Sequence, residues 1–489
     1  MSENEIVGLD ALALSAAIRS RQVSCREAMQ AFLDRIERLN PTFNAIVSLQ
    51  PAEALLAQAD DRDARLARGE WMGWMHGLPQ AVKDLAWTRG IPTTFGSPLF
   101  RDFVPPEDSL VVERARRAGA IIVGKTNTPE FGLGSQTYNT VFGATANAYD
   151  PSKCAGGSSG GAAVALALRM LPVADGSDMG GSLRNPAAFN NVFGLRPSAG
   201  RVPKYPAVET FIEQLGTEGP MGRTVADVAM LLSVQAGHDR RAPLSISEDP
   251  TVFAGALERD LKGARVGWLG DLGGHLPFDD GVLTLCGEGL KALGTVGCVV
   301  EEIPLGFAPE RLWDMWLALR SCVVSGAQQA NYADPARRAQ MKPELIWEVE
   351  NGLRTSALDV YRASVERTAW YRHVCGLFER YDFLVLPSAQ VFPFDITTHW
   401  PRDVGGRAMD TYHRWMEVVI GPTLAGLPAM SVPVGFGANG LPMGMQLIGP
   451  PRGDLAVLQL AHAYEQATRW VRRSPPPAAC LPSESFGTC

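Results

Sequence analysis

Two patterns of apolar residues alternate along the chain. Stripes with a period of about 3.6 residues are typical of helices, and short continuous apolar runs are typical of buried strands. The first clear stripe follows Ser24-Cys25-Arg26-Glu27, a capping box that opens a helix. Its apolar positions continue to Leu39, so the helix is expected to end before Pro41. Further helices are predicted over residues 52–68, 109–118, 161–171, 284–293 and 309–327.

Short apolar runs between these helices predict strands. They cover residues 43–49, 80–85, 119–124, 171–175, 264–268, 298–303 and 382–387. Regular alternation of helices with buried strands is typical of βαβ units. We therefore expect the α/β class: a single large α/β/α domain over residues 1–489, built on a mixed, mostly parallel twisted sheet with helices on both faces. The core is expected over about 65–240 and 410–470, with 240–410 as a variable elaboration of helices and loops.

Charge and composition exclude several classes of protein. Of 489 residues, 45 are Lys or Arg and 52 are Asp or Glu, and this net charge of −7 argues against nucleic acid as the main partner. No run approaches the ~18 apolar residues of a membrane span, and the acidic start MSENEIVGLD is unlike a signal peptide. The eight cysteines form no C-x-x-C pair and have no regular spacing. We expect reduced thiols in a cytoplasmic protein, with neither a disulfide framework nor a zinc site.

The densest cluster of small and polar residues lies near the centre of the sequence. Gly156–Gly161 reads GGSSGG and precedes a helical run, and Asp175–Pro186 reads DGSDMGGSLRNP. Neither segment has the spacing of a phosphate-binding loop. Gly156–Gly160 formally matches the G-x-S-x-G elbow of α/β-hydrolases, but the downstream histidines lie in ordinary helical or loop contexts. Two glycine-rich turns around one buried strand indicate a site where serine hydroxyls and backbone N–H groups converge.

The segment from Gly156 to Pro186 resembles the signature of the amidase signature family, whose members use a Ser–cis-Ser–Lys triad. Further blocks share the resemblance: GLPQAVKDL (77–85), GKTNTPEFG (124–132), FGATAN (142–147), GLRPSAGRVP (194–203), GPMGRTVAD (219–227), GLPAMSVPVGF (426–436) and GLPMGMQLIGP (440–450). It spans most of the chain and weakens over about 240–410. Cys154-Ala155 stands before the glycines where a proline is common, a departure that leaves the assignment intact.

Carried over residue by residue, the resemblance implies that Ser182 is the nucleophile, Ser158 the relay serine after a cis peptide, and Lys83 the base. The implied oxyanion hole consists of the backbone N–H groups of Met179, Gly180, Gly181 and Ser182. Glycines let N–H groups turn toward one point, and lysine acts as a base only where burial lowers its pKa. No metal or organic cofactor is implied, because no cluster of His, Cys, Asp and Glu has metal-ligand spacing.

Other residues in these segments are expected to support the loops. Asp178 and Arg184 are interpreted as supports of the turn before the nucleophile, and Ser159 as a structural turn serine.

The expected function is hydrolysis of an amide C–N bond through a serine acyl-enzyme. The expected partner is a small-molecule amide, with neither nucleic acid nor membrane, and a homodimer is the expected assembly. One alternative is the glutaminase subunit of a tRNA-dependent amidotransferase, which shares this core and works with partner subunits. Another is a catalytically silent protein that has kept the fold.

Residues 309–327 carry the candidate substrate contacts. Trp313, Met315 and Trp316 belong to an apolar face of the predicted helix, which would equally suit packing on the sheet. Two tryptophans and a methionine within four residues also suit the wall of an apolar ligand site, and Arg320 lies one turn further on. We therefore expect a bulky apolar or aryl amide, anilide or carbamate, and not a small amide such as glutamine.

Overall fold

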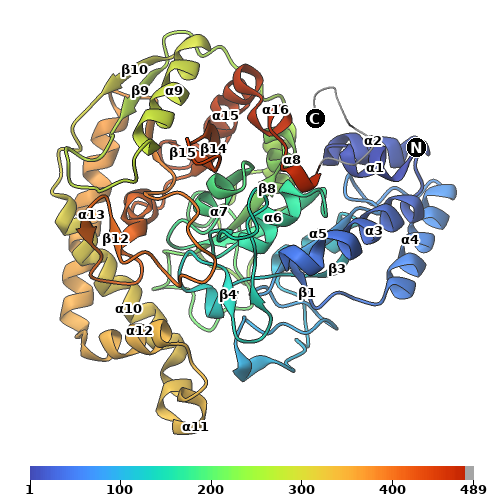
Figure 1. The fold of residues 1–489 in the computed structure, drawn as a ribbon, viewed down its shortest axis with the longest axis horizontal. Helices are drawn as coiled ribbons and strands as arrows, with labels where there is room; N and C mark the ends of the chain where they lie inside the picture. The colour runs from blue at the N-terminus through green and yellow to red at the C-terminus, as the bar shows by residue number, and fades with distance from the viewer. Residues whose placement is uncertain (480–489) are drawn as a thin grey trace.

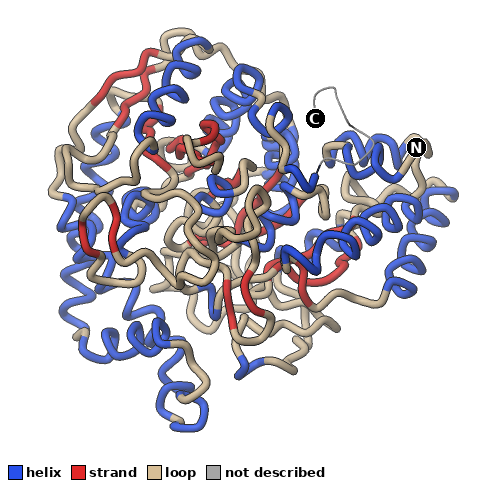
Figure 2. Tube along the Cα trace, in the orientation of Figure 1, coloured by secondary structure: helices blue, strands red, loops and turns tan. Residues whose placement is uncertain are grey.

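The computed structural model describes residues 1–479 (Figures 1 and 2). Its α-helices are α1 (Glu3–Gly8), α2 (Ala11–Arg19), α3 (Cys25–Phe43), α4 (Ala52–Ala67), α5 (Leu110–Arg117), α6 (Gly160–Ala167), α7 (Arg184–Phe189), α8 (Val225–Gln235), α9 (Val282–Thr295), α10 (Pro309–Ala333), α11 (Pro335–Arg338), α12 (Pro343–Arg354), α13 (Ala357–Phe378), α14 (Ile420–Leu424), α15 (Asp454–Thr468) and α16 (Trp470–Arg473). Its strands are β1 (Ile46–Val47), β2 (Pro79–Lys83), β3 (Ile121–Thr126), β4 (Tyr138–Asn139), β5 (Gly143–Ala144), β6 (Val173–Asp178), β7 (Phe193–Arg196), β8 (Thr217–Gly222), β9 (Arg265–Trp268), β10 (Val299–Glu302), β11 (Phe383–Pro387), β12 (Asp403–Val404), β13 (Arg407–Ala408), β14 (Ala429–Phe436) and β15 (Pro442–Ile448).

Helix α3 begins where the sequence predicts and ends later. Ser24 Oγ accepts the Glu27 N–H at 3.1 Å, and Glu27 accepts the Ser24 N–H at 2.8 Å, which confirms the capping box. The predicted end before Pro41 was wrong, because the helix runs past it. The proline costs one backbone hydrogen bond, and the chain beyond it still closes a helical turn. This extension uses up the start of the strand expected over 43–49, which is reduced to Ile46–Val47.

The other predicted elements are confirmed in type, with ends displaced by a few residues. Helices α4, α5, α6, α9 and α10 lie where helices were expected, and β2, β3, β9, β10 and β11 where strands were expected. The strand expected over residues 171–175 is β6, which starts and ends later than predicted. Its second half, GSD, has low strand propensity, so the sequence pattern does not predict that the strand continues there. Pairing with β8 supplies the hydrogen bonds that keep it extended.

The central sheet has eight strands in the order β10-β9-β11-β15-β14-β7-β8-β6. A three-stranded sheet, β1-β3-β2, adjoins it, because β2 packs beside β6. The α/β class and the mixed sheet are confirmed. Within the central sheet, however, β10–β9 and β9–β11 are parallel and the other five pairs are antiparallel. Parallel pairing is less frequent than predicted, because short connections such as the one between β14 and β15 return the chain antiparallel.

Helices cover both faces of the sheet (Figure 1). A Cβ at Gly444 of β15 would meet Ala188 of α7, whereas the next residue, Met445, lies close to Gly289 of α9. Successive strand residues point to opposite faces of a sheet, so α7 and α9 lie on opposite sides.

Residues 240–410, expected to elaborate the core, also form part of the sheet. They supply β9, β10 and β11 at one edge, together with helices α9 to α13 on the left of Figure 1. Most of their buried apolar side chains join those of the flanking segments in one cluster that extends from Ile6 to Tyr464, and Val324, Met341, Leu345 and Val349 form a second cluster with Leu133.

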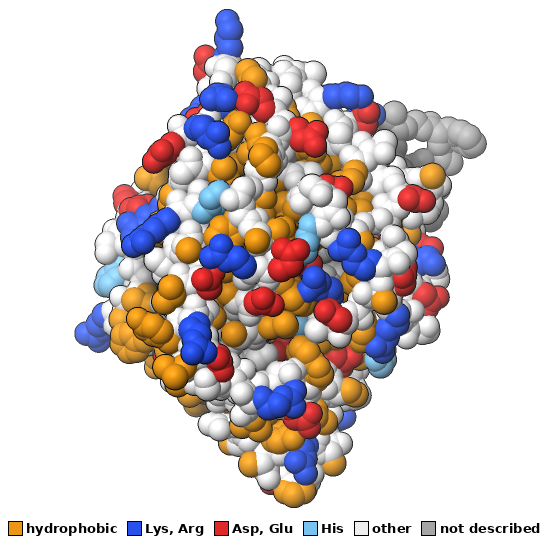
Figure 3. Space-filling model, turned by 90° about the vertical axis from the view of Figure 1, so that its left-hand side faces the viewer, with side chains coloured by type: hydrophobic (Ala, Val, Ile, Leu, Met, Phe, Trp, Pro, Cys, Tyr) orange, Lys and Arg blue, Asp and Glu red, His pale blue; other side chains and the backbone are white. Residues whose placement is uncertain are grey.

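The surface over α13 carries mixed charges. Basic and acidic side chains are interspersed on the face that Figure 3 shows, with apolar side chains between them. Among the exposed apolar residues are Leu358, Tyr361 and Val365 of α13.

None of the helices within residues 1–479 is both long and apolar enough to cross a bilayer. The cysteines in this range are free thiols, and Cys480 and Cys489 lie outside the described residues.

Candidate active site

Lys83 lies at the carboxyl end of β2, in the interior of the protein. Its side chain is buried, and its Nζ atom lies 2.7 Å from Ser158 Oγ, 2.9 Å from Ser159 Oγ and 3.0 Å from Ser177 Oγ. Strand β2 brings the lysine here because it packs beside β6, which carries Ser177. Three hydroxyl groups therefore surround one buried amine.

Burial lowers the pKa of Lys83 to about 7, although the nearby carboxylates of Asp178, Asp175 and Glu218 act in the opposite direction. Near neutral pH a large fraction of the amine is therefore uncharged. An uncharged lysine has a lone pair that can accept a hydroxyl proton, which is what a general base must do.

Ser158 lies in the turn that leads into α6, and the Gly157–Ser158 peptide bond is cis, as the resemblance implies. Ser135 Oγ donates a hydrogen bond to the Gly157 carbonyl at 2.6 Å, which holds this turn in place. On the other side of the hydroxyl lies Gly132, where a Cβ would be 3.3 Å from Ser158 Oγ. The hydroxyl is therefore held beside the lysine in a narrow space.

Ser182 belongs to the loop of residues 179–182, which directly follows β6. Gly181 has a φ of 90°, a left-handed conformation that favours glycine, and a Cβ there would lie 2.8 Å from Val419. Ser182 is 8% exposed against 2% for Ser158, so both serines are buried and Ser182 is the more exposed residue.

Asp178 fixes the shape of the 179–182 loop. Its carboxylate accepts the N–H of Gly181 at 2.9 Å and that of Leu183 at 3.1 Å. Within the described residues, the loop N–H groups without an acceptor are those of Met179, Gly180 and Ser182. Of the four N–H groups expected in an oxyanion hole, that of Gly181 is thus already bonded, and the other three have no acceptor among residues 1–479.

Two buried arginines hold Asp178 in turn. Arg184 binds its two carboxylate oxygens through Nε and Nη2 at 3.0 and 2.9 Å, and Arg196 lies 3.4 Å from Oδ1. Burial alone would raise the pKa of Asp178, but the two guanidinium groups outweigh it and bring the pKa below its usual range. The carboxylate is therefore ionised, and Asp178 and Arg184 support the loop as predicted.

Of the three predicted substrate contacts, Trp316 lies against this loop. A Cβ at Gly180 would be 3.1 Å from the Trp316 indole ring. Trp313 packs on His413, with ring centroids 5.1 Å apart, and all three side chains belong to the buried core. The structure therefore brings one of the three residues to the loop and places the other two in the packing of α10.

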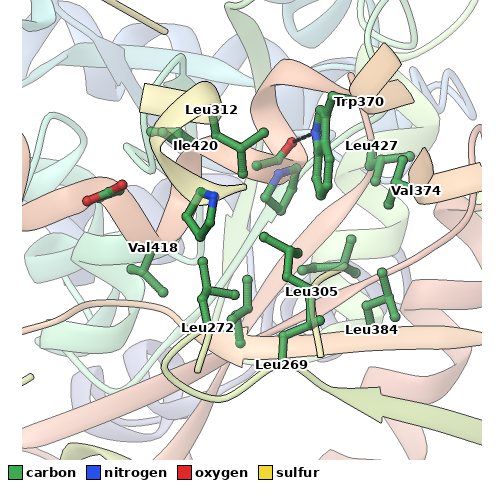
Figure 4. A pocket seen from close by; sticks show the side chains of 16 residues that line it. Leu269, Leu272, Leu305, Leu312, Trp370, Val374, Leu384, Val418, Ile420 and Leu427 are labelled. Carbon is green, nitrogen blue, oxygen red and sulfur yellow. Dashed lines mark hydrogen bonds between the residues drawn. The ribbon is translucent and has the colours of Figure 1, made fainter. Parts of the chain in front are cut away.

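An apolar pocket lies behind residues 417–421 (Figure 4). Its lining includes Trp370, Val418 and Ile420, and its cavity volume is about 30 Å³. This is well below the ~150 Å³ of an engineered apolar cavity that binds benzene, so the pocket is too small for an aryl ring. Val419, between two lining residues, contacts Gly181 instead, so the pocket and the 179–182 loop share a wall.

Three polar residues of this site were not predicted. Ser177 and Ser159, the latter expected to be only a turn residue, both contact Lys83 Nζ, and Asp175 accepts the Lys83 N–H at 3.2 Å. All three belong to the two segments rich in glycine and serine, so composition was the only signal for them. Within residues 1–479, no three His, Cys, Asp or Glu side chains are grouped so that they could hold a metal ion.

Known sequences resemble this chain over nearly its whole length. The profile of the family described as Amidase matches residues 27–458. A glutamyl-tRNA(Gln) amidotransferase subunit from Thermosynechococcus vestitus is 36% identical over 478 residues, which cover 93% of this chain and 97% of that protein.

Solved structures agree with this match. A bacterial aryl acylamidase of the amidase signature enzymes family superposes with a TM-score of 0.88 at 30% identity, over 95% of this chain and 97% of that one. The corresponding glutamyl-tRNA(Gln) amidotransferase subunit from Thermotoga maritima superposes with a TM-score of 0.73 at 26% identity, over 94% and 95% of the two chains. The chain therefore belongs to the amidase family, the amidase signature family that its two glycine-rich segments indicated.

Proposed function

We propose that the chain hydrolyses an amide C–N bond through an acyl-enzyme formed on Ser182. The observation that carries the proposal is the buried amine of Lys83, 2.7 Å from Ser158 Oγ and with a pKa lowered by burial to about 7. A lysine in this state is a base near neutral pH, and strongly shifted pKa values are typical of functional sites. A base beside a serine hydroxyl is the arrangement that activates a nucleophile.

In the proposed reaction, Lys83 Nζ takes the proton of Ser158, Ser158 takes the proton of Ser182, and Ser182 Oγ attacks the carbonyl carbon. The oxyanion then accepts hydrogen bonds from the free N–H groups of the 179–182 loop. Ser158 next gives a proton to the leaving nitrogen and regains one from Lys83, and the C–N bond breaks. A water molecule, deprotonated along the same path, cleaves the acyl-enzyme and releases the carboxylic acid.

The proposed substrate is a bulky apolar or aryl amide, anilide or carbamate. Trp316 lies on Gly180, and Phe131 directly precedes Gly132, the residue beside Ser158. Phe131 belongs to a cluster of half-buried rings with Phe95, Phe100 and Phe103. An aromatic ring against the 179–182 loop and a cluster of rings next to the glycine beside Ser158 favour a planar apolar substrate. The TM-score of 0.88 with an aryl acylamidase, against 0.73 with the amidotransferase protein, supports the same class.

The second candidate is the glutaminase subunit of a tRNA-dependent amidotransferase, which would act with partner subunits. Relatives named for the glutamyl-tRNA(Gln) amidotransferase support it at 35–36% identity, although among the solved structures the amidotransferase subunit is 26% identical and the aryl acylamidase 30%. The proposed reaction at Ser182 is the same for both candidates, so they differ in substrate and in partners.

Two assays on one preparation separate the candidates. Release of p-nitroaniline from acyl anilides by the chain alone, lost in Ser182→Ala, supports the amidase. Release of ammonia from glutamine only after partner subunits are added, with no anilide turnover, would establish the second candidate. Gel filtration of the chain alone tests the homodimer expected from the sequence.

A catalytically silent protein is the third candidate, and it predicts no reaction at Ser182. Labelling by a serine-directed fluorophosphonate, present in the wild type and absent in Ser182→Ala, would exclude it.

A further inference from the structure

Arg320 of α10 lies against the 179–182 loop, and the proposed reaction does not use it. Its Nη1 atom lies 3.3 Å from Sδ of Met179, a residue whose N–H is free for a substrate oxygen. Trp316, one turn earlier on the helix, lies 5.3 Å from the guanidinium group and also contacts Gly180. A hydrogen-bond donor and a flat apolar ring therefore border the same loop.

The guanidinium group of Arg320 has poorly satisfied donors. An arginine carries five N–H groups. Nε donates to Glu348 at 2.5 Å, and Nη2 donates to the Tyr412 hydroxyl at 2.7 Å. Among residues 1–479, the contact of Nη1 is the thioether of Met179, and sulfur is a weak acceptor. Arg320 is only 4% exposed, so its Nη1 protons lie where buried donors normally have a good acceptor.

Glu348 compensates the charge of Arg320. Its buried carboxylate binds Nε of the arginine and accepts the Tyr412 hydroxyl at 2.6 Å. A second carboxylate brought to Nη1 would lose its hydration beside an ion pair that is already neutral overall. The oxygen of an ether, a ketone or an amide loses much less on burial and can accept the same N–H groups. The site therefore suits a neutral acceptor.

We infer that Arg320 determines specificity, by donating from Nη1 to a neutral oxygen in the acyl part of the substrate, close to the scissile carbonyl. The Met179 side chain, which is flexible about three bonds, moves aside to admit that oxygen. The inference rests on the proposed function, because it needs an acyl group at Ser182. It narrows the substrate class to amides of alkoxy-, aryloxy- or keto-acids, in preference to plain alkyl acids or acids with a second carboxylate.

Acylation by two isosteric esters tests this directly. The probes are p-nitrophenyl methoxyacetate and p-nitrophenyl butanoate, which differ in one oxygen, and each enzymatic rate is divided by the hydroxide rate of the same ester. A hydrogen bond to a charged donor should make the methoxyacetyl ester about tenfold or more faster in kcat/KM. As competitors of the ester reaction, methoxyacetamide should bind more tightly than butanamide, and malonamate should bind no more tightly than butanamide.

Substitutions on α10 assign the preference to one side chain. Arg320→Lys keeps a cation for Glu348 but loses the forked donor, so the ratio of the two ester rates should fall to within about threefold of one. Arg311→Lys is the matched control, because Arg311 lies on the same helix in an exposed ion pair with Glu366. Its ratio should be unchanged. If Arg320→Lys does not fold, the pair Arg320→Met with Glu348→Leu removes both buried charges together and should also bring the ratio close to one.

Each result is decisive. Equal corrected rates for the two esters in the wild type would overturn the inference, while acylation at Ser182 left the proposed function standing. Loss of both ester rates by the same factor in Arg320→Lys, with the ratio kept, would show that Arg320 is only structural. Tighter binding of malonamate than of butanamide would overturn the inference that Arg320 prefers an uncharged oxygen to a carboxylate. Acylation that persists in Ser182→Ala would refute the proposed function itself.

Discussion

The pH dependence of kcat/KM should follow the ionisation of Lys83. With burial holding its pKa at about 7, about 10% of the amine is neutral at pH 6 and about 90% at pH 8. Activity should therefore rise about tenfold between these values and then level off, with the optimum on the alkaline side of neutral. A lysine at its ordinary pKa of 10.5 would be only about 0.3% neutral at pH 8, and the rate would still be rising tenfold per pH unit.

Lys83→Arg removes the base and keeps a cation. A guanidinium group stays protonated in proteins, so it cannot accept the Ser158 proton. General-base assistance is typically worth about 10²–10⁴-fold, so kcat/KM at pH 8 should fall by at least about 10² and the acid limb should disappear. Lys125→Arg is the matched control. Lys125 is also buried, with a pKa lowered by burial to about 8, but its Nζ binds Thr88 Oγ1 and not Ser158.

The assay measures p-nitroaniline or p-nitrophenol release from about pH 5.5 to 9.5 at constant ionic strength, with circular dichroism to monitor the fold. If the acid limb of the kcat/KM profile survives in Lys83→Arg, or vanishes in Lys125→Arg, the assignment of Lys83 as the base is refuted. A limb that follows a histidine and is lost when that histidine is substituted would favour the G-x-S-x-G elbow instead.

Three further predictions concern the same residues. Ser182→Ala should abolish turnover, and Ser158→Ala should lie between the wild-type rate and the loss in Lys83→Arg; steady-state rates on one anilide check the order, and full activity in Ser182→Ala would contradict it. Lys83→Met should gain stability relative to the wild type as pH falls from 10.5 to about 7, by up to about 5 kcal/mol, because the folded wild type must hold the amine neutral while the unfolded chain can protonate it. Thermal melts of both proteins at several pH values measure this difference. A difference that grows toward alkaline pH would contradict the lowered pKa of Lys83. Trp316→Leu should lower kcat/KM for an anilide more than for a short aliphatic amide, whereas Trp313→Leu should lower the Tm and both activities together; equal selectivity in the two variants would show that neither ring lines the site.

The sequence determined those features that depend on neighbours along the chain. The capping box of α3 and most buried strands could be predicted, because caps and apolar runs act over a few residues. The two segments that contain Ser158 and Ser182 stand out for the same reason, since glycine is needed where the backbone turns tightly, as at Gly181.

Only the tertiary structure decided how these segments meet. The contact of Ser177 with Lys83 depends on β2 packing beside β6, and their sequence separation hides it. The same holds for Trp316 and Trp313, which share one apolar face of a helix, although only Trp316 reaches Gly180. The direction of the sheet pairs was likewise set by connections that local patterns do not encode. Local patterns fix what each segment can become, whereas the lowered pKa of Lys83 arises from burial among segments far apart in the chain.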